Sequence, residues 1–336
     1  MRDSSRTIAN IPTNVITGFL GVGETSAVLH LLKHKPPAER WAVLVNEFGE
    51  IGVDGSFFAG RHDESGGVFI KEVPGGCMCC AAGLPMQMAL NILLRQARPD
   101  RLLIEPTGLG HPIEVLGVLS GKHYQDVLSI QKVLTLVDAR KLMDERYTGH
   151  ETFNQQIAIA DVIVGNKTDL YGDDEIEALE AYAKEKGTAG ARVVFTEQGV
   201  LEPGLLEGAT AATAHGHHHH EVKEPSAPLD AVPIPESGYV TARNQGEGFH
   251  SIGWRIVPER VFDRTALITF LKSLKAERMK AVFITADGVF GYNLTSDALN
   301  EMELDDCMES RMEIIAGRID DDWERKLFEC LVPEKP

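Results

Sequence analysis

The sequence predicts an α/β protein, with a mostly parallel sheet flanked by helices and a smaller α+β domain at the C-terminus. From residue 14 to about 196, short apolar runs alternate with longer helical patterns, which is typical of strands joined by crossover helices. A glycine-rich turn joins the first apolar run to the first helical pattern. Between 203 and 246 the composition shifts to Pro, Gly, Ala, Glu and His. We therefore expect domains at 1–202 and 247–336, joined by a flexible linker at 203–246.

Seven strands and five helices are expected in the first domain. The strands are the apolar runs Asn14–Thr17, Ala42–Val45, Val68–Val73, Leu102–Ile104, Val133–Val137, Val162–Val164 and Val193–Phe195. The helices lie near 25–34, 84–97, 112–120, 152–160 and 174–187.

The second domain is expected to contain a hairpin around Asp287-Gly288, a favourable turn between Ala281–Thr285 and Val289–Leu294. Residues 297–306 are interpreted as a solvated acidic stretch, because they lack the spacing and central glycine of a calcium loop. The other expected elements are the strands Phe249–Ile256 and Met312–Ile315 and the helices Phe262–Leu274 and Asp320–Leu331.

The predicted linker contains a histidine tract, and such tracts are metal-binding by composition. A flexible polar spacer and an engineered tag are the alternatives. The histidines taken as candidate metal ligands are His215, His217, His218, His219 and His220.

Composition restricts the function classes. With 33 Lys and Arg against 50 Asp and Glu, the net charge of −17 disfavours nucleic acid or an anionic membrane as the main partner. No apolar run approaches eighteen residues, and we expect a cytoplasmic protein. Three of the five cysteines fall within four residues, which favours metal or thiol chemistry over a disulfide framework. Cys307 and Cys330 stand apart and are expected to be packing residues.

The run Gly18–Ser26 has the spacing of a phosphate-binding loop between a strand and a helix. Its glycines let backbone N–H groups converge on phosphate, and the Thr25 hydroxyl is the expected Mg²⁺ ligand. The candidate nucleotide-binding residues in this loop are Gly18, Gly21, Val22, Gly23, Glu24, Thr25 and Ser26.

Glu24 stands where this motif carries lysine. A unit charge about 4 Å from a phosphate oxygen contributes about 4 kcal/mol at an effective dielectric near 20. Losing even about 3 kcal/mol lowers affinity about a hundredfold. We therefore expect weak nucleotide binding and slow hydrolysis, and interpret Glu24 as an introduced or incidental change.

The tetrapeptide Asn166-Lys167-Thr168-Asp169 directly follows a predicted strand. The carboxylate of Asp169 can accept both adjacent donors of guanine, whereas adenine cannot satisfy it, so the motif specifies GTP over ATP. Asn166 is expected to bond the purine edge, and the stem of Lys167 is expected to cover the ring.

Polar residues follow two other strands. Glu105 ends a buried strand, where a carboxylate can hold Mg²⁺, and the N–H of Gly108 could meet a γ-phosphate. Glu47 and Glu50 lie in a glycine-punctuated loop, which is either a nucleotide-responsive switch contacting metal or water, or merely solvated. The catalytic candidates are Glu47, Glu105 and Gly108.

Cys77, Cys79 and Cys80 follow two glycines, and three thiolates in four residues can converge on one soft metal ion. A redox role is the competing interpretation. Glu47, Glu50 or His111 could fill the fourth ligand position.

Together, Gly18–Ser26, the Val45–Glu50 run, Gly75–Cys80, Glu105–Leu109 and Asn166–Asp169 resemble the CobW family of P-loop GTPases, relatives of nickel-insertion GTPases. The resemblance covers essentially the whole chain and implies a P-loop NTPase fold with a CobW-type C-terminal domain. It implies a metallochaperone that uses GTP/GDP and Mg²⁺ and carries Zn²⁺ or Co²⁺ on the three cysteines. Glu24 and His111 depart from the usual family pattern.

The leading hypothesis is a cytoplasmic GTPase that couples hydrolysis to metal transfer into a client metalloprotein; a homodimer is allowed. One alternative is a zinc-buffering or sensing protein without GTP turnover, which Glu24 favours. Another is an accessory protein for cobalt insertion, in cobalamin synthesis or nitrile hydratase maturation.

Overall fold

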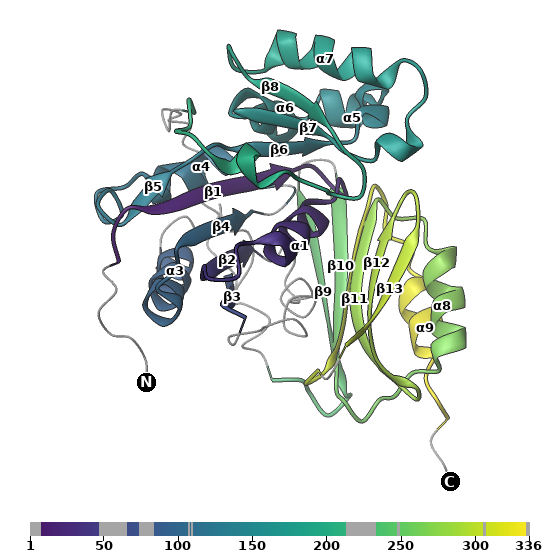
Figure 1. The fold of residues 1–336 in the computed structure, drawn as a ribbon. Helices are drawn as coiled ribbons and strands as arrows, with labels where there is room; N and C mark the ends of the chain where they lie inside the picture. Colours follow the sequence, from purple (N-terminus) through teal and green to yellow (C-terminus); the bar gives the residue numbers. More distant parts are fainter. Residues whose placement is uncertain are drawn as a thin grey trace. The chain divides into compact units, whose positions relative to one another are not determined.

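The computed structural model describes residues 8–46, 66–73, 84–106, 108, 110–212, 233–246, 249–304 and 307–333. The chain divides into two compact units, each with its own sheet (Figure 1). In the described residues, no helix is long and apolar enough to cross a membrane.

The N-terminal unit contains a parallel sheet in the order β3-β2-β4-β1-β6-β7-β8, and β5 also pairs with β1. All seven predicted strands are confirmed, and β5 is an additional short strand. The strands are β1 (Ile11–Gly18), β2 (Trp41–Asn46), β3 (Val68–Val73), β4 (Arg101–Glu105), β5 (Leu128–Ile130), β6 (Leu134–Val137), β7 (Val162–Gly165) and β8 (Arg192–Phe195).

Helices connect these strands, as expected for a parallel sheet. They are α1 (Glu24–His34), α3 (Leu84–Ala97), α4 (Pro112–Leu119), α5 (Glu145–Thr148), α6 (Glu151–Ala158) and α7 (Glu175–Lys186), with the 3₁₀ turns η1 (Ala139–Met143), η2 (Thr168–Leu170) and η3 (Pro203–Leu206). All five residues of β4 are buried, because the sheet is covered on both faces. The chain leaves β1 through α1 toward β2 on one side and leaves the neighbouring strand β6 toward β7 on the other side. The carboxyl ends of β1 and β6 are therefore the topological switch point, where ligands bind in such sheets.

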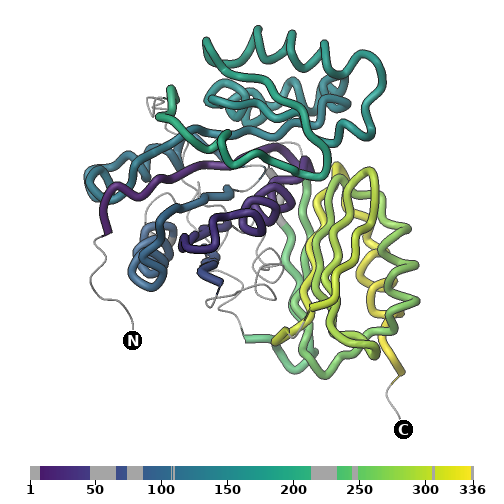
Figure 2. The backbone as a smooth tube through the Cα atoms, in the orientation of Figure 1, coloured from purple at the N-terminus to yellow at the C-terminus, as the bar shows by residue number. Residues whose placement is uncertain are grey.

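The side chain of Asn14 in β1 forms hydrogen bonds to three other segments of the N-terminal unit. It is fully buried, and its amide donates to the carbonyl oxygens of Lys132 at 2.9 Å and Leu206 at 2.8 Å. Its oxygen accepts from the Arg101 guanidinium at 2.7 Å, and Arg101 also pairs with Glu207. The chain after β8 therefore returns to the centre of its own sheet (Figure 2).

The C-terminal unit is a six-stranded antiparallel sheet in the order β13-β12-β11-β14-β10-β9, with α8 and α9 along one face (Figure 1). Its core includes the fully buried side chains of Trp254, Phe283 and Tyr292. The elements are β9 (Tyr239–Gly246), β10 (Phe249–Ile256), α8 (Arg264–Ser273), β11 (Arg278–Thr285), β12 (Gly288–Thr295), β13 (Leu299–Leu304), β14 (Ser310–Ala316) and α9 (Trp323–Phe328).

Two of these strands were not predicted. β9 falls inside the range 203–246 assigned to the linker, and at the other end of that range η3 packs into the N-terminal unit. β13 forms within the stretch interpreted as solvated and acidic; the acidic side chains are solvated as expected, but the strand was missed. Its acidic side chains are exposed while Leu304 is buried, so the strand needs only one packed side.

The two isolated cysteines are packing residues, as predicted. Cys330 is buried in the core of the C-terminal unit, and burial raises the pKa of its thiol to about 11. Cys307 packs against the small cluster of Ala242, Val282 and Leu304.

We predict that Asn14→Ala lowers the free energy of unfolding of the N-terminal unit by about 2–4 kcal/mol, because it leaves a buried guanidinium and two carbonyl groups short of partners. Urea unfolding followed by far-ultraviolet circular dichroism measures the change. Lys122→Ala, at an exposed position of the same unit, is the control and should stay within about 0.5 kcal/mol of the parent chain. Equal midpoints for the two variants would contradict the prediction.

Candidate functional site

The loop between β1 and α1 depends on its glycines. Gly21 and Gly23 have φ angles of 70° and 104°, in the left-handed region. A Cβ on Gly23 would lie 2.6 Å from Nδ2 of Asn166, and a Cβ on Gly18 would lie 2.4 Å from Cγ2 of Val22. The loop therefore closes tightly over the end of β1, as the phosphate-loop interpretation requires.

Aromatic packing around Phe19 anchors this loop. Phe19 is fully buried, and its ring meets His150 at 4.7 Å, Tyr147 at 5.2 Å and Phe153 at 5.8 Å between centroids, all edge to face. Such aromatic pairs add stability beyond the area they bury. The loop is thus anchored to α5 and α6 by protein contacts.

The first turn of α1 faces Glu105 at the end of β4. The Thr25 hydroxyl donates to Oε1 of Glu105 at 2.6 Å, and Glu105 is only 6% exposed. The N-cap of α1 is Gly23, so no side chain caps the first N–H groups of the helix. A hydroxyl and a carboxylate beside uncapped N–H groups form a donor set that fits Mg²⁺ together with phosphate.

Gly108 lies against the same loop. A Cβ there would be 3.4 Å from the carbonyl oxygen of Gly18 and from the backbone nitrogen of Leu20. The side chain of Gln156 on α6 donates to the carbonyl oxygen of Gly108 at 3.0 Å. The structure thus brings Glu105 and Gly108, two of the three catalytic candidates, to the phosphate loop.

Glu24 is the first residue of α1 and is 6% exposed. Its Cγ lies against Gly18, 3.2 Å from where a Cβ would be, and its carboxylate has no hydrogen bond or ion pair with any described residue. An acidic group in the first turn of a helix is favoured by the helix dipole. Glu24 is therefore compatible with the fold, but it places negative charge where the loop would receive phosphate.

Asn166 at the end of β7 links the two halves of the site. It is 2% exposed, its Nδ2 donates to the carbonyl oxygen of Val22 at 2.8 Å, and its Oδ1 accepts from the N–H of Gly199 at 3.0 Å. The sequence predicted a contact with the purine edge. The structure gives Asn166 a further role, as the connection between the phosphate loop and the loop after β8.

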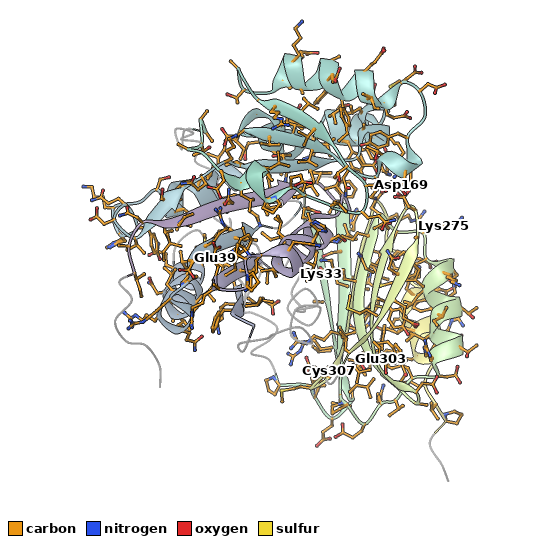
Figure 3. All side chains as sticks on the ribbon, in the orientation of Figure 1. Lys33, Glu39, Asp169, Lys275, Glu303 and Cys307 are labelled. Carbon is orange, nitrogen blue, oxygen red and sulfur yellow. The ribbon has the colours of Figure 1, made fainter. Side chains whose placement is uncertain are left out.

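Lys167 and Asp169 follow Asn166 in the segment after β7. Lys167 has a φ of 68°, and its ammonium lies 3.6 Å from Oδ2 of Asp138. Asp169 is exposed on η2 (Figure 3), and its carboxylate bonds to no described residue. The carboxylate of Asp169 is therefore available to accept the paired donors of a guanine.

Tyr171 supports the backbone beside Asp138. Its hydroxyl accepts from the N–H of Ala139 at 3.0 Å and donates to the carbonyl oxygen of Val137 at 3.3 Å. Burial raises the pKa of Tyr171 to about 12, so the hydroxyl stays protonated and remains a donor.

The loop after β8 is a part of the site that sequence reasoning missed. Gln198 and Gly199 have φ angles of 52° and 71°, and the carbonyl oxygen of Thr196 accepts from the N–H of Thr168 at 3.2 Å. A Cβ on Gly199 would lie 2.7 Å from the backbone nitrogen of Ala27, so the loop touches α1 directly. The sequence did contain a signal for this loop: Gly199 follows the predicted strand Val193–Phe195 at the edge of the sheet where ligands bind.

A family model described as "CobW/HypB/UreG, nucleotide-binding domain" matches residues 12–194, more than half of the chain. The chain belongs to this family. The described nucleotide site lies in the matched range, apart from part of the loop after β8.

The chain is 40% identical over 320 residues to the zinc chaperone YeiR of Escherichia coli (strain K12), covering 93% of this chain and 94% of the relative. It is 28% identical over 250 residues to the zinc chaperone CobW of Pseudomonas aeruginosa, covering 64% and 66%. Among solved structures, the Zn(II)-bound YjiA GTPase from E. coli covers 96% of this chain and 99% of its own, with 19% identity and a TM-score of 0.42.

Several predicted site residues lie outside the described part of this CobW/HypB/UreG chain. They are Glu47, Glu50, Cys77, Cys79, Cys80, His215, His217, His218, His219 and His220. Within the described residues, no group of three or more histidine, cysteine, aspartate or glutamate side chains could hold a metal ion. The three-cysteine metal site therefore stays a prediction.

We predict that Gly23→Ala destabilises the N-terminal unit by about 1–3 kcal/mol, because alanine is strained at φ 104° and its methyl group displaces Asn166. Urea unfolding measures the change. Gly117→Ala is the matched control: it lies exposed within α4 with no atom within 4 Å of the added carbon. It should stabilise the chain by about 0.5–1 kcal/mol, and a loss at both positions would argue against a specific role for Gly23.

Proposed function

We propose that this chain is a GTP-dependent zinc chaperone of the cytoplasm that delivers its metal ion to a client metalloprotein. The observation that carries the proposal is the joined site, in which Asn166 connects a phosphate loop to a base-binding edge with an available carboxylate on Asp169. The identity with YeiR, named a zinc chaperone, over nearly the full length of both chains supports the metal and the role.

Asp169 supplies the preference for guanine. Its exposed carboxylate would accept the N1–H and 2-amino donors of GTP, while ATP would leave it unsatisfied. Lys167, held by Asp138, would lay the stem of its side chain along the ring.

Thr25 and Glu105 would hold Mg²⁺, whose bound ion would neutralise charge on the β- and γ-phosphates. The N–H of Gly108 would donate to a γ-phosphate oxygen, and Glu47 would orient the attacking water. Because Gly108 lies against the phosphate loop, its segment would shift slightly when the γ-phosphate is lost.

Cys77, Cys79 and Cys80 would carry Zn²⁺, with Glu47 or Glu50 as a further ligand and the histidine tract as a secondary reservoir. Strand register supports coupling to the nucleotide. β2 pairs with both β3 and β4, with Asn46 opposite Val73 and Val45 opposite Glu105. The switch-like segment therefore follows β2 and the cysteine segment follows the adjacent strand β3. The end of β2 also adjoins Glu105, the proposed Mg²⁺ ligand on β4.

We predict that Glu24→Lys tightens GTP binding about a hundredfold and accelerates hydrolysis, because it replaces repulsion of the phosphates by attraction. Fluorescent nucleotide titration and phosphate release measure the two effects, and ATP is the control nucleotide for specificity. Glu24→Gln, which only removes the negative charge, should give an intermediate affinity. If the parent chain already binds and hydrolyses GTP as well as Glu24→Lys, the charge of Glu24 does not limit the site.

A second candidate function is a zinc-buffering or sensing protein that does not turn over GTP. Glu24 is the specific observation that favours it, since a carboxylate lies at the phosphate-binding helix end. Metal release to a chelator separates the two: a chaperone should release zinc at different rates with GTP and with GDP, and a buffer at equal rates.

We predict that changing Cys77, Cys79 and Cys80 together to serine removes one tightly bound Zn²⁺ per chain, because serine hydroxyls are poor zinc ligands beside thiolates. Metal content after dialysis against a weak chelator measures the stoichiometry. Cys307→Ser, at a cysteine that packs against an apolar cluster, is the control and should leave it unchanged. Full metal content in the triple variant would contradict the assignment.

A further inference from the structure

A buried glutamine on α6 is hydrogen-bonded to the backbone beside the phosphate loop. The side chain of Gln156 is 1% exposed, and its Nε2 donates to the carbonyl oxygen of Gly108 at 3.0 Å. Gly108 in turn lies against the loop, where a Cβ would be 3.4 Å from the carbonyl oxygen of Gly18 and the backbone nitrogen of Leu20. The amide of Gln156 therefore restrains a backbone segment that touches the phosphate loop.

The helix that carries Gln156 is itself fixed at this point. The Thr135 hydroxyl on β6 donates to the backbone carbonyl oxygen of Gln156 at 2.7 Å, in a buried contact. On the same helix, the ring of Phe153 packs edge to face on Phe19 of the phosphate loop. Because α6 is joined both to the central sheet and to the loop, the Gln156 amide bonds Gly108 from a fixed position.

The oxygen of the Gln156 amide has no partner. A carbonyl oxygen can only accept, so the amide atom that faces the Gly108 carbonyl is the nitrogen. The Oε1 atom of Gln156 is buried and accepts no hydrogen bond from any described residue. A buried acceptor without a donor costs free energy, and an apolar side chain of the same length would avoid that cost. Packing therefore does not account for a glutamine at this position, whereas the bond to Gly108 does.

We propose that Gln156 is a positioning residue of the nucleotide site, which keeps Gly108 against the phosphate loop where it meets a γ-phosphate. The inference rests on the proposed function, in which the N–H of Gly108 donates to that phosphate. Without the Gln156 bond, Gly108 occupies this position for a smaller fraction of the time, and the apparent affinity for GTP falls by the same factor. GDP has no γ-phosphate and does not use Gly108. Gln156 thereby favours GTP over GDP.

Gln156→Met tests this role in the full-length chain, because methionine keeps the length of the side chain and removes both the donor and the unpaired oxygen. Competition with a fluorescent guanine nucleotide measures the dissociation constants of GTP and GDP separately. The affinity for GTP should fall about fivefold, the effect of one ordinary hydrogen bond. The affinity for GDP should stay unchanged, which also shows that the variant is folded.

Gln155→Met is the matched control. The neighbouring Gln155 also has a buried Oε1 without a partner among the described residues, but its side chain is not bonded to Gly108. Both nucleotide affinities should therefore stay at the values of the parent chain.

Gln156→Glu tests the donor itself. An ionised carboxylate cannot donate to the Gly108 carbonyl oxygen, whereas a protonated carboxyl group can. The preference for GTP over GDP should therefore be lost in this variant at high pH and recover at low pH, and it should not recover in Gln156→Met.

An unchanged preference in Gln156→Met, or equal losses of GTP and GDP affinity, would overturn this inference and leave the proposed function intact. If neither the parent chain nor Glu24→Lys binds either nucleotide, the proposed function itself fails, and this inference fails with it.

Discussion

The amide of Asn166 is the contact on which the candidate site depends. One buried side chain satisfies the carbonyl of Val22 in the phosphate loop and the N–H of Gly199 in the loop after β8. Both groups lie far from Asn166 in the sequence, and each would otherwise be a buried polar group without its partner. The amide therefore fixes the end of β7 relative to the phosphate loop and to the loop after β8.

The shape and the charge of this site have separate origins. Its shape comes from uncharged contacts: glycines that admit close approach, Phe19 among three aromatic rings, and the amide of Asn166. At the first turn of α1, the negative charge comes from Glu24, whose carboxylate also suits a helix N-terminus. A charge reversal at this residue can therefore change affinity for phosphate while the loop keeps its conformation.

The sequence predicted the parallel sheet well because its strands are short apolar runs separated by helices. It missed β13 because the few apolar residues of this strand alternate with acidic and polar ones. It missed β9 because this strand directly follows a Pro-rich region. It predicted a contact of Asn166 with the nucleotide, but it did not predict that Asn166 connects two loops. That role arises from a contact between positions 144 residues apart, which periodicity and local motifs do not encode.

The parallel sheet also gives the proposed metal-binding segment and the nucleotide site a common edge. A path of direct contacts runs from the phosphate loop to β3. The Thr25 hydroxyl donates to Glu105 at the end of β4, β4 pairs with β2, and β2 pairs with β3. Parallel strands end at the same side of a sheet, which brings successive βα segments together regardless of their separation in sequence. A ligand that moves Glu105 acts on the end of β4, which adjoins the end of β2, and β2 in turn adjoins β3, the strand that precedes the cysteine segment. Coupling of the two proposed sites would therefore cross two strand spacings, from β4 to β2 and from β2 to β3.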